Sequence, residues 1–294
     1  MLSRCFLSEA TFHYYGPNRD TTFPDLFNKL TAIIPGSQPP KTLITIVKDF
    51  VREARLSNIT LRVSEANSVP DGGQANLSNT IGAAIWTLVT AMEFAQAGTS
   101  GINFHWGHAG IRRPKKYEED AYRDVRPGQL EGGAPAYVGM QIGFDEVGTP
   151  YPLVRVPFYG YVMFSRAFGN NGPGIFLNFS SDAVVSECRD LFFTYAVLVP
   201  HAGIISVVAA NANTNMTCNV TATLPGVSTA GATLQLLQGP YGNMTAYEGV
   251  KLAGQTYQGQ SEQDLQAICD LVLLLVRHLC LCWVPKGHKR QYCR

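Results

Sequence analysis

The chain contains the run ITLRVSEANSVPDGG, residues 59–73. The apolar and β-branched residues 59–63 predict a strand, and Glu65 follows at the point where this strand ends. The Gly72-Gly73 pair then predicts a turn that leads into a helix. In a barrel of alternating strands and helices, catalytic groups lie at the C-terminal ends of the strands. Glu65 is therefore the first candidate catalytic residue.

Strand and helix patterns alternate on both sides of this run. Residues 11–15 predict a strand before it and residues 101–105 predict one after it. Apolar residues at 43–51 recur at helical spacing, and a second helix is expected from an N-cap at Ser78 to a stop at Gly98. Repeats of this kind imply parallel strands in an α/β sheet or barrel.

The second half of the chain has a different pattern. Residues 107–150 predict a long loop, and residues 158–168 predict one more helix. Beyond residue 172, short strands separated by turn residues indicate an antiparallel sandwich, with strands expected at 192–199, 204–210, 218–224 and 233–237. The expected fold class is α/β plus all-β: a partial (β/α)8 TIM barrel of about three β-α units, then an antiparallel β-sandwich domain. The expected domains are the partial barrel at 1–172, the sandwich at 173–260 and an atypical apolar and basic tail at 261–294.

Composition excludes some functions and suggests a compartment. The chain has 294 residues, 46% of them hydrophobic, which is ample for a core. Its formal net charge of +1 gives no electrostatic case for a nucleic-acid partner. No signal peptide is visible in this chain, yet Asn-x-Ser/Thr sequons recur, which indicates an extracellular or secretory-pathway origin for the parent protein. The candidate glycosylation sites are Asn58, Asn76, Asn178, Asn215, Asn219 and Asn243.

The cysteines and the tail allow several interpretations. Cys188 and Cys218 lie in folded-looking sequence and can form one disulfide. The cysteines near the C-terminus lack the usual zinc spacing, so no metal and no cofactor are expected. The apolar run at 271–284 is interrupted by Arg277-His278 and falls short of the roughly 20 apolar residues of a membrane span. A membrane partner is therefore not expected; a tail anchor is the alternative to an aberrant terminus.

Polar residues gather at the ends of the three predicted strands. Tyr14, Tyr15, Asn67 and His105 lie at or just beyond these ends, as Glu65 does. Barrel geometry would bring such positions around one pocket. A tyrosine hydroxyl that donates to Glu65 would keep the carboxylate ionised, as a nucleophile requires. The alternative for Glu65 alone is a surface glutamate that ends a strand.

The motifs together resemble a known family. They are Phe12-His13-Tyr14-Tyr15, Ser64-Glu65-Ala66-Asn67-Ser68-Val69, Gly72-Gly73, Ser78-Asn79-Thr80, Ala83-Ala84-Ile85-Trp86, Asn103-Phe104-His105, Pro157-Phe158-Tyr159-Gly160 and Lys251-Leu252-Ala253-Gly254. This combination resembles glycoside hydrolase family 79, which contains β-glucuronidases and heparanase-like endo-glucuronidases. The resemblance spans roughly residues 9–259 and implies that the three repeats are the C-terminal part of the barrel.

The resemblance also implies roles for individual residues. Glu65 would be the nucleophile of a retaining mechanism, with Tyr14 or Tyr15 as its orienting donor. Asn67 and His105 would contact substrate, and the backbone amides of Gly107 and Gly110 would bind a uronate carboxylate. The implied partner is a β-glucuronide-containing oligo- or polysaccharide.

The sequence departs from this family in two ways. A retaining glycosidase needs a second carboxyl about 5 Å from the nucleophile, and the family carries it in an Asn-Glu pair that this chain lacks. Three β-α units also fall short of a closed barrel. We therefore expect a truncated glycosidase that is inactive by itself, with open sheet edges and a broad exposed apolar face. The alternative is a non-catalytic carbohydrate-binding or interaction protein that uses the sandwich.

Overall fold

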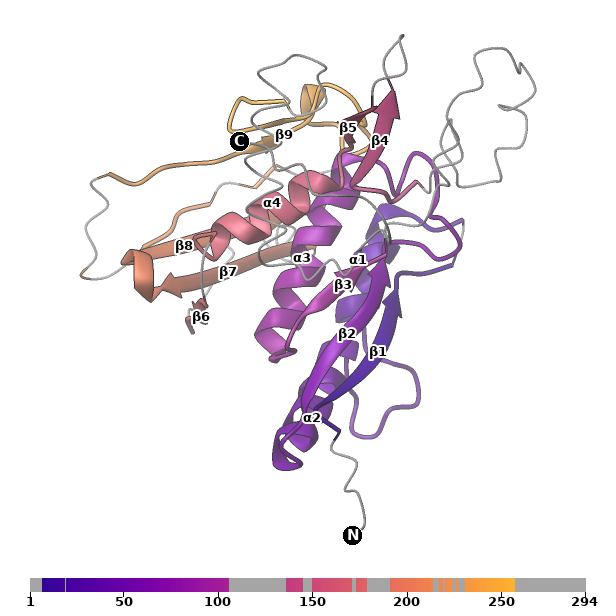
Figure 1. The fold of residues 1–294 in the computed structure, drawn as a ribbon, viewed down its shortest axis with the longest axis vertical. Helices are drawn as coiled ribbons and strands as arrows, with labels where there is room; N and C mark the ends of the chain where they lie inside the picture. The colour runs from indigo at the N-terminus through magenta and orange to yellow at the C-terminus, as the bar shows by residue number, and fades with distance from the viewer. Residues whose placement is uncertain are drawn as a thin grey trace, which may run out of the picture.

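A parallel three-stranded sheet forms the first part of the fold (Figure 1). The computed structural model describes residues 7–18, 20–105, 136–144, 150–170, 173–178, 191–213, 217–218, 220–223, 226 and 231–256. Strands β1 (Glu9–Tyr15), β2 (Thr60–Asn67) and β3 (Ile102–Phe104) lie in the order β1-β2-β3, and both pairs are parallel. The prediction of three successive parallel strands is confirmed. Within the described residues the sheet does not close into a barrel.

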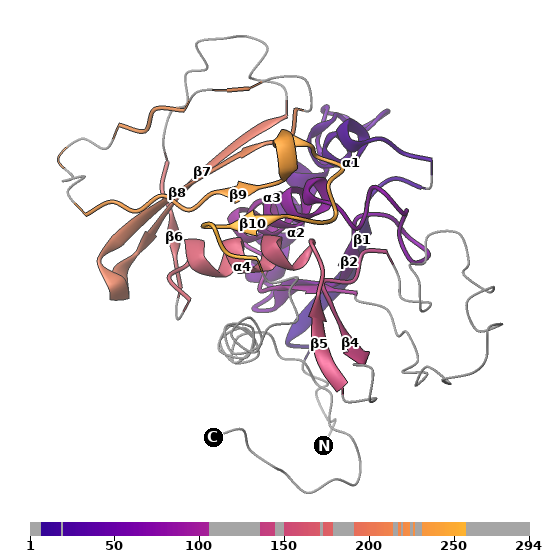
Figure 2. The same ribbon diagram turned by 90° about the horizontal axis from the view of Figure 1, so that it is seen from above.

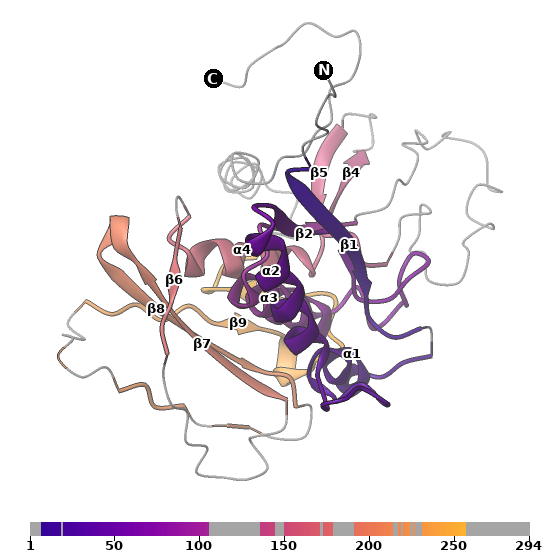
Figure 3. The ribbon, with the colours of Figure 1, turned by 90° about the horizontal axis from the view of Figure 1, so that it is seen from below.

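Helices cover one face of this sheet (Figure 3). Helix α2 (Leu43–Leu56) begins at Thr42, whose side chain accepts a hydrogen bond from the Thr45 amide. Helix α1 (Phe23–Thr31) was not predicted from the sequence pattern; it begins with a capping box between Thr22 and Asp25. Its buried residues join those of α2 and the sheet in one core.

The opposite face of the sheet is polar. Along β1 and β2, apolar side chains such as Phe12 and Val63 pack toward the helices. The residues between them point the other way, and Glu9 forms an ion pair of 3.1 Å with Arg62 there. The expectation of a broad exposed apolar face is therefore wrong for the described strands, because their apolar residues alternate onto the covered side.

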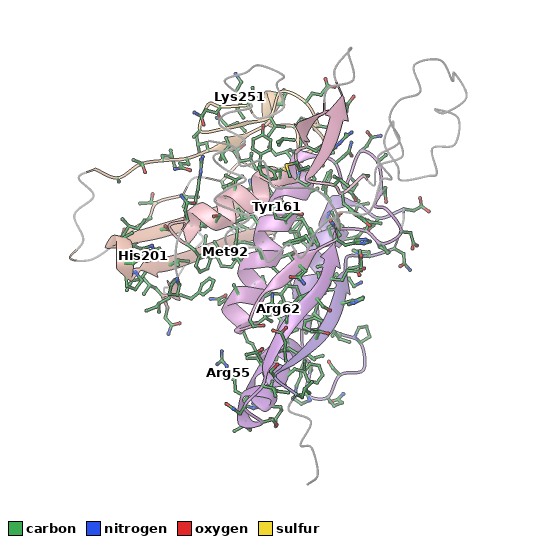
Figure 4. All side chains as sticks on the ribbon, in the orientation of Figure 1. Arg55, Arg62, Met92, Tyr161, His201 and Lys251 are labelled. Atoms are coloured by element: carbon green, nitrogen blue, oxygen red, sulfur yellow. The ribbon has the colours of Figure 1, made fainter. Side chains whose placement is uncertain are left out.

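Helix α3 (Ile81–Ala97) is the centre of the molecule, and it is buried on nearly all sides. One side packs on the sheet through Trp86 and Phe94. The other side carries Leu88 and Met92 against the second half of the chain, and Figure 4 labels Met92 between α3 and the neighbouring strands. Burial on both sides explains why the helix is apolar all round.

The two ends of α3 differ in how well the sequence predicted them. Gly98 ends the helix in the left-handed conformation (φ 92°), as predicted. The first residues of α3 are capped by tertiary contacts, because the amides of Ile81 and Gly82 donate to the carbonyls of Ala246 and Met244. Figure 2 shows this later segment, which includes η4 (Pro240–Gly242), beside α3. The prediction of Ser78 as N-cap is wrong; the N-cap is Thr80.

The second half of the chain is mainly antiparallel. Strands β4 (Met140–Phe144) and β5 (Pro150–Val154) form a hairpin, so part of the predicted loop is a strand. Helix α4 (Phe158–Ala167) confirms the helix predicted at 158–168. Strands β6 (Ile175–Phe176), β7 (Phe192–Val199) and β8 (Ile204–Asn211) form one antiparallel sheet, in which β7 and β8 are joined by η3 (Pro200–Ala202). Strands β9 (Leu237–Gln238) and β10 (Lys251–Leu252) form another.

The β7–β8 sheet packs against helices. Tyr195 and Val208 lie in one cluster with Leu88 and Met92 of α3 and with Ala167 of α4. The predicted strands at 192–199 and 204–210 are confirmed. The strand predicted at 218–224 is wrong for its described residues, and the one at 233–237 is reduced to the start of β9. The tail at 261–294 lies outside the described residues.

Candidate functional site

Glu65 lies near the C-terminal end of β2, inside the strand. Its orientation depends on a β-bulge, because Phe12 pairs with Val63 whereas His13 pairs with Glu65, which leaves Ser64 as the extra residue. With strict alternation, Glu65 would follow Val63 toward the helices. The bulge places Glu65 on the polar face instead, beside the end of β1.

Tyr15 is the partner that this orientation brings to Glu65. Its hydroxyl donates to Glu65 Oε1 at 2.5 Å. Burial, followed by the hydrogen bond to the Glu65 carboxylate, raises the pKa of Tyr15 far above its usual range. Tyr15 therefore keeps its proton at neutral pH and remains a donor to Glu65. This interaction matches the orienting role that was expected for one of the two tyrosines.

His105 joins the pair from the end of β3. Its Nδ1 lies 2.8 Å from Tyr15 Oη and 3.5 Å from Glu65 Oε1. The His105 side chain is 45% exposed and that of Glu65 is 35% exposed, so a ligand can reach both. The structure thus brings together Tyr15, Glu65 and His105 from three successive strands.

Tyr137 is a further member of the cluster that the sequence did not reveal. Its hydroxyl lies 3.3 Å from His105 Nδ1. Burial raises its pKa, and the charge of Glu65 adds to that shift. No motif marks Tyr137, because it lies more than thirty residues after β3 in sequence, in a segment of glycines and alanines.

The Gly72-Gly73 turn holds Tyr137 in place. The Ala136 amide donates to the Gly72 carbonyl at 2.7 Å. Gly73 has a φ of +83°, and a Cβ on it would lie 3.0 Å from the Tyr137 ring and from Ser78 Cβ. The Ser78 hydroxyl is 2.8 Å from that of Ser68 and accepts from the Gln74 amide at 3.0 Å. Ser78 therefore fixes the turn after β2.

The remaining predicted contacts divide into three cases. Asn67 is 3% exposed, and its amide donates to the His105 carbonyl at 2.7 Å, so it joins the ends of β2 and β3. Tyr14 is 4% exposed and stacks on Trp86 in the core, so the structure does not bring it to this cluster. Gly107 and Gly110 lie outside the described residues.

The predicted modification sites are partly described. Asn58, Asn76, Asn178 and Asn243 are all exposed. Asn215 and Asn219 lie outside the described residues, as does Cys188. Cys218 is disulfide-bonded, and every other cysteine of the chain lies outside the described residues.

The cluster offers a carboxylate with two hydroxyls and an imidazole. Across the described ranges, no three His, Cys, Asp or Glu side chains gather into a metal-binding group. None of the helices in that part of the chain has the length and apolar character needed to cross a bilayer. An ionised carboxylate held by a tyrosine on an accessible face can act as a nucleophile or bind a ligand hydroxyl. No protein-family model and no curated protein matches this sequence.

Proposed function

We propose that the chain carries the nucleophile half of a retaining glycosidase site whose substrates are β-glucuronides. The observation that supports it best is the Glu65 carboxylate at the end of a parallel strand, accepting the Tyr15 hydroxyl on an accessible face. Position, orientation and a neutral donor are what a carboxylate nucleophile requires. The preference for glucuronides rests on the sequence motifs alone.

In the proposed reaction, Glu65 attacks the anomeric carbon of the sugar and forms a glycosyl ester. The bond to the leaving oxygen breaks, and the leaving group departs with the electron pair. An ordinary sugar alkoxide needs a proton at that moment, and a second carboxyl must supply it. The chain lacks the Asn-Glu pair that would provide this acid, so we expect negligible turnover of natural β-glucuronides by residues 1–294.

An activated substrate tests attack by the nucleophile without the need for the missing acid. Dinitrophenolate is a weak base and leaves without protonation, and a fluorine at C2 slows hydrolysis of the ester. We expect 2,4-dinitrophenyl 2-deoxy-2-fluoro-β-glucuronide to label the full chain covalently. Intact mass and peptide mapping would place the sugar on Glu65.

Two variants make this experiment decisive. Glu65→Gln should abolish the label, whereas Glu53→Gln, on the exposed side of α2, should be labelled like the wild type. Absence of the label, or a label that survives Glu65→Gln, would reject the proposed nucleophile. Turnover of an unactivated glucuronide that disappears in Glu65→Gln would instead overturn the expected inactivity.

The carbohydrate-binding alternative has less support among the described residues. The large apolar side chains exposed on β6 and β8 are aliphatic, namely Ile175, Ile204 and Val207. Among the described residues of the predicted sandwich, Tyr247, which is 51% exposed, offers a single aromatic ring on which a sugar can stack. Oligosaccharide binding by the full chain that is unchanged in Glu65→Ala would favour this alternative over the glycosidase site.

A further inference from the structure

We propose that His105 is a positioning residue for Glu65: it carries its proton on Nδ1, donates to Tyr15 Oη, and leaves Nε2 as an open acceptor. The role of His105 in hydrolysis rests on the proposed function, whereas the location of the proton on His105 Nδ1 does not depend on it. The sequence indicated only that His105 would contact substrate. The structure suggests that one ring nitrogen acts on Tyr15 and the other is left for a ligand.

The direction of the hydrogen bonds follows from counting protons. Tyr15 has a single hydroxyl proton, and an ionised carboxylate can only accept. The 2.5 Å contact with Glu65 Oε1 therefore uses that proton. The Tyr15 oxygen also lies 2.8 Å from His105 Nδ1, so the nitrogen must be the donor in that contact. The result is a directed chain from His105 through Tyr15 to Glu65.

Neighbouring groups are compatible with this direction. His105 Nδ1 lies 3.3 Å from the Tyr137 hydroxyl, which can accept from the same N–H. The backbone of His105 is fixed on both sides, since its amide donates to the Ala66 carbonyl at 2.9 Å and its carbonyl accepts from Asn67. These bonds fix the main chain of His105, and the contacts of Nδ1 with the Tyr15 and Tyr137 hydroxyls hold the ring.

This arrangement has two consequences for the site. Because the proton shared with Tyr15 is on Nδ1, a contact made at Nε2 leaves the donor to Glu65 in place. When Nε2 carries no proton, its lone pair can accept a hydrogen bond from a ligand hydroxyl, such as one of a sugar. A carboxylate ligand would instead require protonated Nε2.

Nitrogen NMR of the full chain labelled with ¹⁵N-histidine tests the proposal. At about pH 8, where an ordinary imidazole is neutral, we expect a pyrrole-type Nδ1 and a pyridine-type Nε2 for His105. Loss of these signals in His105→Gln assigns them. Exposed His201, outside the cluster, serves as an internal reference.

Paired tyrosine variants provide the matched controls. Tyr15→Phe removes the nearer acceptor, at 2.8 Å from Nδ1, and leaves the Tyr137 hydroxyl at 3.3 Å. The share of the tautomer with its proton on Nε2 should therefore rise relative to the wild type. Tyr14→Phe, on the adjacent position of the same strand, should leave the signals unchanged. Circular dichroism confirms that each variant is folded. A wild-type Nε2–H tautomer would overturn the proposal, because Tyr15 would then donate to His105 and Glu65 would carry a proton.

The two proposals can fail separately. The Nδ1–H tautomer without covalent labelling of Glu65 would reject the glycosidase function and retain the hydrogen-bond chain. Labelling of Glu65 together with an Nε2–H tautomer would retain the nucleophile and reject the role of His105.

Discussion

Tyr14 and Tyr15 are adjacent on β1, yet removal of their hydroxyls should have opposite effects on stability. The Tyr14 hydroxyl is buried and has no hydrogen-bond partner among the residues that the structure describes. A buried unsatisfied polar group costs about 1–3 kcal/mol. Because Tyr14→Phe keeps the ring contact with Trp86, we expect it to stabilise the fold by about 1 kcal/mol. That corresponds to a rise in Tm of roughly 2–4 °C for a chain of this size.

Tyr15→Phe should act in the other direction. A hydrogen bond to a charged group contributes about 1.5–3 kcal/mol, and solvent reduces that value here because the Glu65 side chain is 35% exposed. We therefore expect a loss of about 1 kcal/mol. Urea titration followed by the fluorescence of buried Trp86 measures both changes. Destabilisation by Tyr14→Phe of about 1 kcal/mol or more would refute the reasoning, since it would mean that the hydroxyl has a partner.

Two further substitutions test the packing around α3. Burial raises the pKa of Glu93, although the hydrogen bond from Tyr195 and the charge of Lys48 act to lower it. The protonated carboxyl of Glu93 therefore contributes stability at low pH, and this contribution is lost as the pH rises through the folded-state pKa. Glu93→Gln should therefore gain stability relative to the wild type as the pH rises above about 4, the ordinary pKa of a glutamate. Parallel urea titrations measure this gain, and a difference independent of pH would contradict it. Gly160→Ala should destabilise by about 1–3 kcal/mol in thermal melts, because a Cβ there would lie 2.3 Å from the Ala84 carbonyl oxygen of α3. A gain in Tm, as Ala over Gly gives in an open helix, would mean that the two helices do not approach this closely.

Much of the first half of the fold could be predicted because its signals are local. Apolar, β-branched and aromatic residues mark β1 and β2, the spacing of Val47 and Val51 marks α2, and Gly98 supplies the left-handed residue that ends α3. The position of Glu65 near the end of a parallel strand also follows from this periodicity. The antiparallel half was predicted less well, because residues 218–224 resemble a strand in composition while their described part pairs with no other strand.

The sequence by itself determined that Glu65, Tyr15 and His105 come from the ends of consecutive parallel strands. Only the tertiary structure decided how they face one another. The bulge at Ser64 turns Glu65 away from the core, and the pleat separates Tyr15 from Tyr14. Tyr137 comes from a distant segment, which is held by the hydrogen bond from the Ala136 amide to the Gly72 carbonyl. Likewise, α3 begins where residues 244–246 accept its first amides, and these partners depend on packing between distant segments that no local pattern encodes.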